Sequence, residues 1–458
     1  MNTELSRDID KFIAENEEEI FRNIARLVAI NSVETEAKPG APFGEGPARA
    51  LKEALAMARE LGLDAVNCED MMGYAQIGEG EDYLATITHL DVVPTGDGWS
   101  SDPFTMRQRG GYIIGRGVMD DKGPSVLCLY ALKYLKDSGM PLRYPVRALL
   151  GLNEENHMAD LDYYLANYKA PLFCFSPDAN FPLCNGEKGI FHGKVVSWLP
   201  MKRVKDIRGG VAANVIPDQA EAWVEAEKLS STERVTAQRE GDCWHLTAKG
   251  IGGHASAPEG TVNAIGVLVD YILEQGILSG AEEDFFYGLQ RLHSDPYGVN
   301  LGLDTEDMIF TPLTIVGGVI GMEDGHLFQT VDCRYPTTSS GPDIVAQLTG
   351  NWGELAEIHV LSDSKPFYME LDNPAVQVCV DTYNAVTGEQ AQPYTIGGGT
   401  YARHFPNAVS FGPEHPERPA PDFAGPIHGV DEAANIQWLM EALKIYILAL
   451  MELEKLDY

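Results

Sequence analysis

The sequence predicts an α/β domain built from both ends of the chain, with a largely parallel mixed sheet flanked by helices, and an α+β domain inserted in the middle. Three observations lead to this fold class. The 458 residues exceed a typical domain of about 150 residues, helix-like and strand-like patterns alternate in the first third, and helical patterns return at the end.

The first third alternates amphipathic helices with short apolar runs of strand length. Apolar residues at helical spacing predict helices over 8–30, 47–61 and 122–136, and continuous apolar runs predict buried strands over 83–88, 146–152 and 172–175. Strands that alternate with helices form parallel sheets, and the sites of such sheets lie beyond the carboxyl ends of the strands.

From residue 187 the pattern changes to that of a half-exposed sheet. Strands are predicted over 190–198 and 220–227, a glycine-rich turn at 250–253, and a helix over 263–273. Helical patterns resume over 374–386 and from Asp431, with a glycine-rich loop at 397–399 between them. We therefore predict one discontinuous domain, residues 1–186 and 372–458, and an inserted domain, residues 187–371.

Composition limits the partners and the compartment. The 34 basic and 68 acidic side chains give a formal charge of −34, which repels nucleic acid and anionic membranes, so we expect neither as a partner. The seven cysteines include no Cys-x-x-Cys pair, and we expect them to be reduced core residues of a cytoplasmic protein. The polar segment 1–19 is unlike a signal peptide, and no apolar run reaches the roughly 20 residues of a membrane span.

Residues with metal-binding chemistry follow the predicted strands. His89 and Asp91 end the strand at 83–88 and would share a face, so the carboxylate can hold the imidazole as a metal ligand. The alternative is a capping Asp beside a surface His. Asp120 and Asp121 precede a predicted helix, where they are either metal ligands or helix caps.

The next strands end in the same way. Glu154 and Glu155 follow the strand at 146–152, and because adjacent side chains point apart, one can bind a metal while the other holds a water. A solvated loop is the alternative. Asp178 follows the short strand at 172–175, and His428 precedes the last predicted helix.

Taken together, these residues predict a binuclear metal site. Two histidines and three carboxylates suit a pair of divalent ions with one carboxylate bridging them, and the set is His89, Asp120, Glu155, Asp178 and His428. Glu154 is then free to act as general base on a metal-bound water. The sequence contains no Gly-x-Ser-x-Gly elbow and no Walker loop.

These motifs resemble the co-catalytic zinc metallopeptidases of the aminoacylase and glutamate carboxypeptidase superfamily. Within it, the chain is most similar to the bacterial dipeptidase V branch of Xaa-His, carnosinase-like dipeptidases. The resemblance covers nearly the whole chain, and its motifs lie at 89–94, 98–99, 115–124, 153–155, 177–182, 252–256 and 397–403.

The resemblance implies roles for the residues of the discontinuous domain, which becomes the catalytic, metal-binding domain. The five residues of the binuclear set become ligands of two divalent ions that Asp120 bridges; zinc is the expected ion, with manganese or cobalt as alternatives. Asp91 would orient His89, Glu154 would be the base, and the peptide bond after Asp120 would be cis. The Asp at the third ligand position, 178, favours substrates with a free amino end.

The inserted domain corresponds to the family's lid. By resemblance, Asn214 and His254 stabilise the oxyanion, and Arg334 and the loop Gly398-Gly399 bind the carboxylate of the substrate. The alternatives are that His254 is only a turn residue and that Arg334 only pairs with a nearby acid such as Asp332.

The resemblance implies a cytoplasmic, metal-dependent dipeptidase of broad specificity that acts as a monomer on small peptides. An N-acyl amino acid deacylase or a succinyl-diaminopimelate-type amidase is the first alternative. A non-catalytic metal-binding protein is the second.

Overall fold

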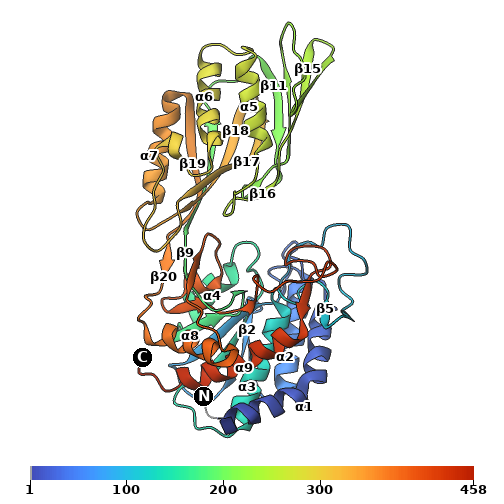
Figure 1. Ribbon diagram of the computed structural model, residues 1–458, viewed down its shortest axis with the longest axis vertical. Coiled ribbons are helices and arrows are strands. Elements are labelled where there is room, and N and C mark those ends of the chain that lie inside the picture. The colour runs from blue at the N-terminus through green and yellow to red at the C-terminus, as the bar shows by residue number, and fades with distance from the viewer. Residues whose placement is uncertain (1–2) are drawn as a thin grey trace. The chain divides into compact units, whose positions relative to one another are not determined.

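The computed structural model describes residues 3–458, which form two compact units (Figure 1). The first unit comprises residues up to 185 together with 368–394 and 400–458, and the second comprises 186–367 and 395–399. The short segment 395–399 joins the second unit because Lys188 N–H donates to the Ile396 carbonyl at 2.9 Å, and because Arg334 donates to the Gly397 carbonyl at 3.0 Å.

The first unit is built on a nine-stranded mixed sheet. The strands in order across the sheet are β1 (Asp64–Cys68), β2 (Met72–Ile77), β6 (Val146–Gly151), β3 (Leu84–His89), β7 (Phe173–Ser176), β22 (Ala408–Ser410), β9 (Cys184–Glu187) and β20 (Phe367–Tyr368), with β21 (Tyr394–Ile396) also paired to β9. The central strands β6, β3, β7 and β22 run parallel, and β2 runs antiparallel to both of its neighbours, β6 and β1. The carboxyl ends of the central strands therefore meet at one edge.

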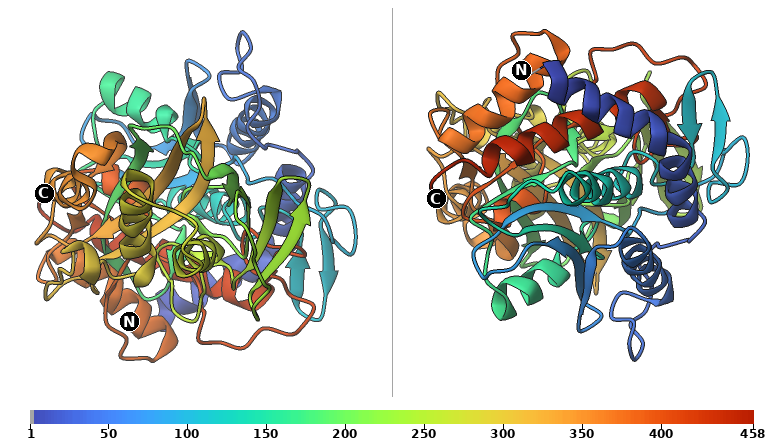
Figure 2. Two further views of the ribbon diagram at one scale, coloured as in Figure 1. Left: turned by 90° about the horizontal axis from the view of Figure 1, so that it is seen from above. Right: turned by 90° about the horizontal axis from the view of Figure 1, so that it is seen from below.

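Helices cover both faces of this sheet (Figure 2). One face carries α1 (Thr3–Val28), α3 (Lys122–Asp137), α8 (Pro374–Thr387) and α9 (Ile436–Leu453), and the other carries α2 (Glu45–Glu60) and α4 (Ala159–Asn167). In α1 the buried residues Ile9, Ile13, Ile20 and Ile24 recur at helical spacing, and this apolar stripe packs towards α3 and α9.

The last helix begins at Ile436, five residues later than the sequence predicts. The Asn435 side chain caps it by accepting from the N–H groups of Gln437 and Trp438. The preceding residues instead form β24 (Ala433–Asn435), which pairs with β5 (Tyr112–Ile114), and β5 pairs in turn with β4 (Arg107–Arg109). A local propensity pattern does not reveal this pairing, because the two strands are far apart in the chain.

The second unit is an antiparallel sheet packed against helices. Its strands in order are β14 (Val235–Glu240), β15 (Cys243–Lys249), β13 (Gln219–Val224), β11 (Val204–Gly209), β17 (Thr314–Glu323), β18 (His326–Tyr335), β10 (Gly189–Ser197) and β19 (Ala356–Ser364). Buried residues alternate along β10, as expected for a sheet with one covered face. The helices are α5 (Ala264–Glu274), α6 (Ala281–Ser294) and α7 (Gly341–Trp352), and they share a core with the sheet.

Two short strand pairs and three 3₁₀ turns complete the described chain. The strand pairs are β12 (Val215–Ile216) with β16 (Gly253–His254), and β8 (Ala179–Asn180) with β23 (Pro413–Glu414); the turns are η1 (Val299–Leu301), η2 (Gly353–Leu355) and η3 (Tyr401–His404). The predicted fold class, a mostly parallel α/β sheet with helices and a separate antiparallel sheet domain, is confirmed. Among residues 3–458, none of the helices is long and apolar enough to cross a membrane.

Candidate metal and catalytic site

The predicted site residues of the first unit gather at the carboxyl edge of its sheet. His89 is the last residue of β3, Glu154 and Glu155 follow its neighbour β6, and Asp178 follows its other neighbour β7. Asp120 lies in the loop before α3, and His428 lies in the loop before β24. The parallel order of the three strands thus brings together residues from five separate segments.

Asp120 lies at the centre of this cluster. Its Oδ1 is 2.9 Å from His89 Nε2, and its Oδ2 is 2.8 Å from His428 Nε2. His428 Nε2 is also 3.2 Å from Glu155 Oε2. Each oxygen of one carboxylate therefore faces a different imidazole, an arrangement that is compatible with a carboxylate bridging two ions.

Two overlapping groups of ligand atoms are close enough to hold ions. One group is His89, Glu154 and Asp178, the other is His89, Asp120 and Glu155, and within each group the ligand atoms lie within 4.8 Å of one another. Glu154 thus lies within reach of an ion, although the sequence assigns it as a base. Its position therefore suits either a ligand or a base acting on a water between the ions.

The residues fit a pair of divalent ions. His89 Nε2 lies 2.9 Å from Asp120 Oδ1 but does not form a hydrogen bond with it, and Glu155 Oε1 has no hydrogen-bond partner among residues 3–458 either, as expected for atoms that bind a metal. The imidazole and carboxylate ligands suit zinc, manganese or cobalt. Two divalent ions would also balance the negative charges of the four clustered carboxylates, which are Asp120, Glu154, Glu155 and Asp178.

The pKa values reflect this concentration of buried carboxylates. Burial raises the pKa of Glu154, and repulsion from Asp178 raises it further. Burial likewise raises the pKa of Asp178, with Asp120 as the next cause. Burial opposes ionisation of Asp120 as well, but its contacts with His428 and His89 outweigh burial and lower its pKa. The cluster therefore favours a positive charge in its midst.

Asp91 organises more of the site than the sequence predicts. Its Oδ1 lies 3.4 Å from His89 Nδ1, and its backbone carbonyl lies 3.0 Å from the same nitrogen. In addition, its carboxylate accepts from the backbone N–H groups of Glu154 at 3.3 Å and Glu155 at 3.2 Å. One buried carboxylate thus fixes the ends of two neighbouring strands.

A buried ion pair that the sequence analysis missed holds the Asp120 loop. Glu432 accepts from Arg116 at 2.7 Å, and it also accepts from the backbone N–H groups of Gly117, Met119 and Asp120 at 3.1–3.3 Å. Both charged side chains are 1% exposed. The sequence did contain a signal for this ion pair. Arg116 and Glu432 are charged residues without a predicted role, and they lie in the segments that supply Asp120 and His428.

The two aspartates before α3, Asp120 and Asp121, have side chains that contact different groups. The peptide bond between Asp120 and Asp121 is cis, as the resemblance implies. Asp121 precedes the helix, but its side chain makes no capping hydrogen bond; its Oδ2 accepts from the His89 N–H at 3.2 Å. The interpretation of this pair as helix caps is therefore wrong.

In the second unit, the residues proposed for the oxyanion lie together. Strand β16 ends at His254 and pairs with β12, and the Ala255 N–H donates to the Asn214 carbonyl at 2.9 Å. His254 is exposed, and its Nδ1 lies 2.7 Å from Ser256 Oγ. Asn214 and His254 are thus neighbours on one short ladder.

Arg334 lies beside the glycine-rich loop, also within the second unit. Its Nε and Nη2 donate to the two carboxylate oxygens of Asp332 at 2.7 and 2.9 Å, and its Nη1 donates to the Gly397 carbonyl at 3.0 Å. A side chain at position 397 would meet the Ser256 Cβ at 3.1 Å. The loop carrying Gly398 and Gly399 therefore passes between Arg334 and the turn after His254.

Arg334 thus pairs with Asp332, as the simpler interpretation of this residue expects. The pairing also fixes the orientation of the guanidinium, which retains further N–H donors beyond these three bonds. It is therefore compatible with a role in binding a carboxylate.

Comparison with known proteins places this geometry in a family. Residues 85–452 match the model of peptidase family M20/M25/M40. The chain belongs to this family. It is 34% identical over 465 residues to a putative dipeptidase of Bacillus subtilis strain 168, covering 97% of this chain and 99% of the relative. It is 31% identical over 466 residues to a β-Ala-Xaa dipeptidase of Lactobacillus delbrueckii subsp. lactis, covering 95% and 96%.

Two solved structures share the fold of this chain. Human carnosine dipeptidase 1 aligns over 99% of both chains with a TM-score of 0.61 at 14% identity. The aminoacylhistidine dipeptidase of Vibrio alginolyticus aligns over 95% of this chain and 96% of its own, with a TM-score of 0.56 at 14% identity. The prediction of a metallopeptidase of this superfamily is confirmed.

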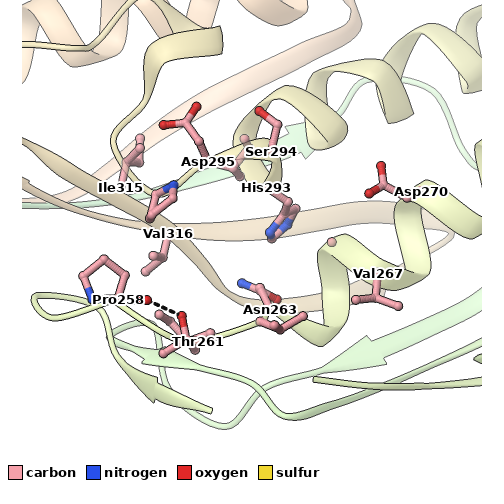
Figure 3. Close-up of a pocket in the computed structure, with 15 residues that line it drawn as sticks. Pro258, Thr261, Asn263, Val267, Asp270, His293, Ser294, Asp295, Ile315 and Val316 are labelled. Carbon is pink, nitrogen blue, oxygen red and sulfur yellow. Dashed lines mark hydrogen bonds between the residues drawn. The ribbon is translucent and has the colours of Figure 1, made fainter. Parts of the chain in front are cut away.

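The second unit of this M20 peptidase also contains a pocket of about 270 Å³ (Figure 3). It is lined by residues of α5, the end of α6 and β17, including Asn263, Asp270, His293 and Asp295. None of the site residues predicted from the sequence lines it. The site is therefore defined by the clustered ligands and not by this cavity.

Proposed function

We propose that this M20 peptidase is a metal-dependent dipeptidase of broad specificity. The observation that carries the proposal is the position of Asp120, whose two carboxylate oxygens each lie within 3 Å of a different histidine. The similarity to a putative dipeptidase and to a β-Ala-Xaa dipeptidase over nearly the full length supports dipeptides as the substrate class. The proposed ligands of two divalent ions are His89, Asp120, Glu155, Asp178 and His428.

Divalent ions bound to these residues would polarise the peptide carbonyl. They would also lower the pKa of a bound water, so that it ionises near neutral pH. Zinc is the expected ion, and manganese and cobalt are alternatives that the same nitrogen and oxygen ligands accept. Asp91 would hold the imidazole of His89 in position for this role, since both of its contacts to that ring are with Nδ1.

Glu154 is proposed as the general base. Its carboxylate would take the proton from the attacking water and pass it to the nitrogen of the leaving amine, so one residue serves both halves of the reaction. Its backbone N–H is held by Asp91, and its buried position among the ligands keeps the carboxylate next to the reacting atoms.

The second unit is proposed to act as the lid implied by the family resemblance. His254 would donate to the oxyanion, with Asn214 beside it, and a donor of this kind contributes about 3–4 kcal/mol of transition-state stabilisation. Arg334 and the backbone of Gly398 and Gly399 would bind the free carboxylate of the dipeptide. A monomer in the cytoplasm stays a prediction from the sequence.

A substrate panel tests this proposal. The protein loaded with zinc or with manganese should cleave free dipeptides faster than tripeptides and N-acyl amino acids. Preferential cleavage of N-acyl amino acids would indicate the deacylase or amidase alternative. Two bound ions without turnover of any compound in the panel would indicate a non-catalytic metal-binding protein.

A further inference from the structure

A dipeptide carries a charge at each end, and the proposed function assigns residues only to its carboxylate. The free ammonium group needs a partner in the first unit, near the metal ligands. Glu414, at the end of β23, lies in this region without an assigned role. A role for Glu414 in binding the amino end of the substrate rests on the proposed dipeptidase function.

Backbone pairing places Glu414 beside the chain segment that carries Asp178. Strand β23 runs parallel to β8, with Glu414 in register with Asn180, and the Phe181 N–H donates to the Glu414 carbonyl at 2.8 Å. Asp178 lies two residues before Asn180. The pairing therefore brings Glu414 next to the chain segment that follows Asp178.

Electrostatics agree with this position. The pKa of the Glu414 carboxyl is raised to about 7, first by burial and then by repulsion from Asp120 and Glu432, which outweigh the attraction of His428. Conversely, Glu414 is one of the carboxylates that raise the pKa of Asp178. Glu414 is therefore within electrostatic reach of the candidate ligands.

Unlike those of Glu432 and Glu155, the carboxylate of Glu414 has no hydrogen-bond or ion-pair partner of its own in the described part of the chain. Among residues 3–458, none donates a hydrogen bond to its half-buried carboxylate or forms an ion pair with it, and it belongs to neither candidate metal group. Glu432, by contrast, is paired with Arg116, and Glu155 contacts His428. A partly buried carboxylate without a partner is costly, and a cationic ligand would remove that cost.

We propose that the Glu414 carboxylate binds the free ammonium group of the dipeptide substrate. An ammonium group offers three N–H donors to such a carboxylate, and charge-assisted bonds of this kind are stronger than neutral ones. A substrate whose amino group is absent or acylated would leave Glu414 half-buried and unpaired, so the site would discriminate against it. Glu414 thus selects dipeptides over N-acyl amino acids.

The test compares two substrates that differ only in the amino group, alanyl-alanine and propionyl-alanine. In Glu414→Gln, which keeps the shape but loses the charge, kcat/KM for alanyl-alanine should fall about 10- to 100-fold, while kcat/KM for propionyl-alanine should change less than about twofold. Elemental analysis should still find two ions per chain, as in the wild type. The matched control is Glu417→Gln, an exposed carboxylate on the same loop, which should leave both values unchanged.

Two results would overturn the proposal. One is an equal loss on both substrates, which would indicate a structural role, and the other is loss of bound metal, which would make Glu414 a ligand. If the wild type cleaves no dipeptide, the proposed function fails, and calorimetric binding to the metal-loaded protein still tests Glu414. Alanyl-alanine should then bind at least about tenfold more tightly than propionyl-alanine, and only in the presence of Glu414; equal binding refutes the inference.

Discussion

Glu432→Gln should unfold the protein at a markedly lower temperature and release its metal. The substitution keeps one carbonyl oxygen for the backbone N–H groups of Gly117, Met119 and Asp120, but it turns an amide NH₂ towards the Arg116 guanidinium. Arg116 is 1% exposed, so it cannot recover its lost partner from water.

The magnitude follows from this burial. Removing one partner of a buried ion pair costs about 3–5 kcal/mol, because the remaining charge is left without compensation. A loss of that size lowers the unfolding temperature by roughly 6–20 °C, since 1 kcal/mol corresponds to about 2–4 °C in a domain of 150–250 residues. The Asp120 loop would loosen as well, so affinity for the proposed ions should fall.

Differential scanning calorimetry and elemental analysis measure both effects. The control is Asp457→Asn, which breaks the exposed pair with Arg143 and should leave the unfolding temperature nearly unchanged, because solvent screens that pair. If Glu432→Gln unfolds within about 2 °C of the wild type and retains both ions, the ion pair does not hold the site as we infer.

Three further predictions concern the proposed bridge, the binding of the substrate carboxylate and the half-buried His293. Asp120→Ala should fail to retain two ions in elemental analysis, because each of its oxygens faces a different histidine; two tightly held ions would refute the bridge. Arg334→Ala should lower kcat/KM for free dipeptides by the equivalent of about 2–4 kcal/mol and change cleavage of amidated dipeptides little, and equal losses on both would exclude binding of the substrate carboxylate by Arg334. Burial lowers the pKa of His293 from 6.5 to about 4, so its neutral form contributes stability above pH 6.5 that is lost as the pH falls towards 4. In urea unfolding, the loss of stability from pH 6.5 to pH 4 should be about 3 kcal/mol smaller in His293→Leu than in the wild type; an equal loss in both proteins would rule out a contribution from His293.

The position of the site could be predicted because the signal is local. Apolar runs in the sequence predict the strands of the sheet. The polar residues that follow these runs, His89, Glu154-Glu155 and Asp178, predict the edge where the site lies. The parallel pairing of β3 with β6 and β7 then brings these residues together without further information from the sequence.

The contacts that support the site were not predictable in the same way. Glu432 reaches the Asp120 loop across more than 300 residues of chain, and no periodic pattern encodes such a contact. The same holds for Glu414, whose place beside Asp178 depends on a two-residue strand pair. The late start of the last helix has the same origin, because residues 433–435 pair with β5 instead of joining the helix.

The most direct test of the central claim is metal content and turnover measured together in Glu154→Gln. Glu154 lies close enough to His89 and Asp178 to be a ligand, whereas we propose that it is the base. We predict that the variant keeps two ions per chain and the wild-type unfolding temperature, while kcat on free dipeptides falls by about 10²–10⁴-fold through loss of proton transfer. A variant that binds fewer than two ions, or that retains more than about a tenth of the wild-type kcat, would contradict the account.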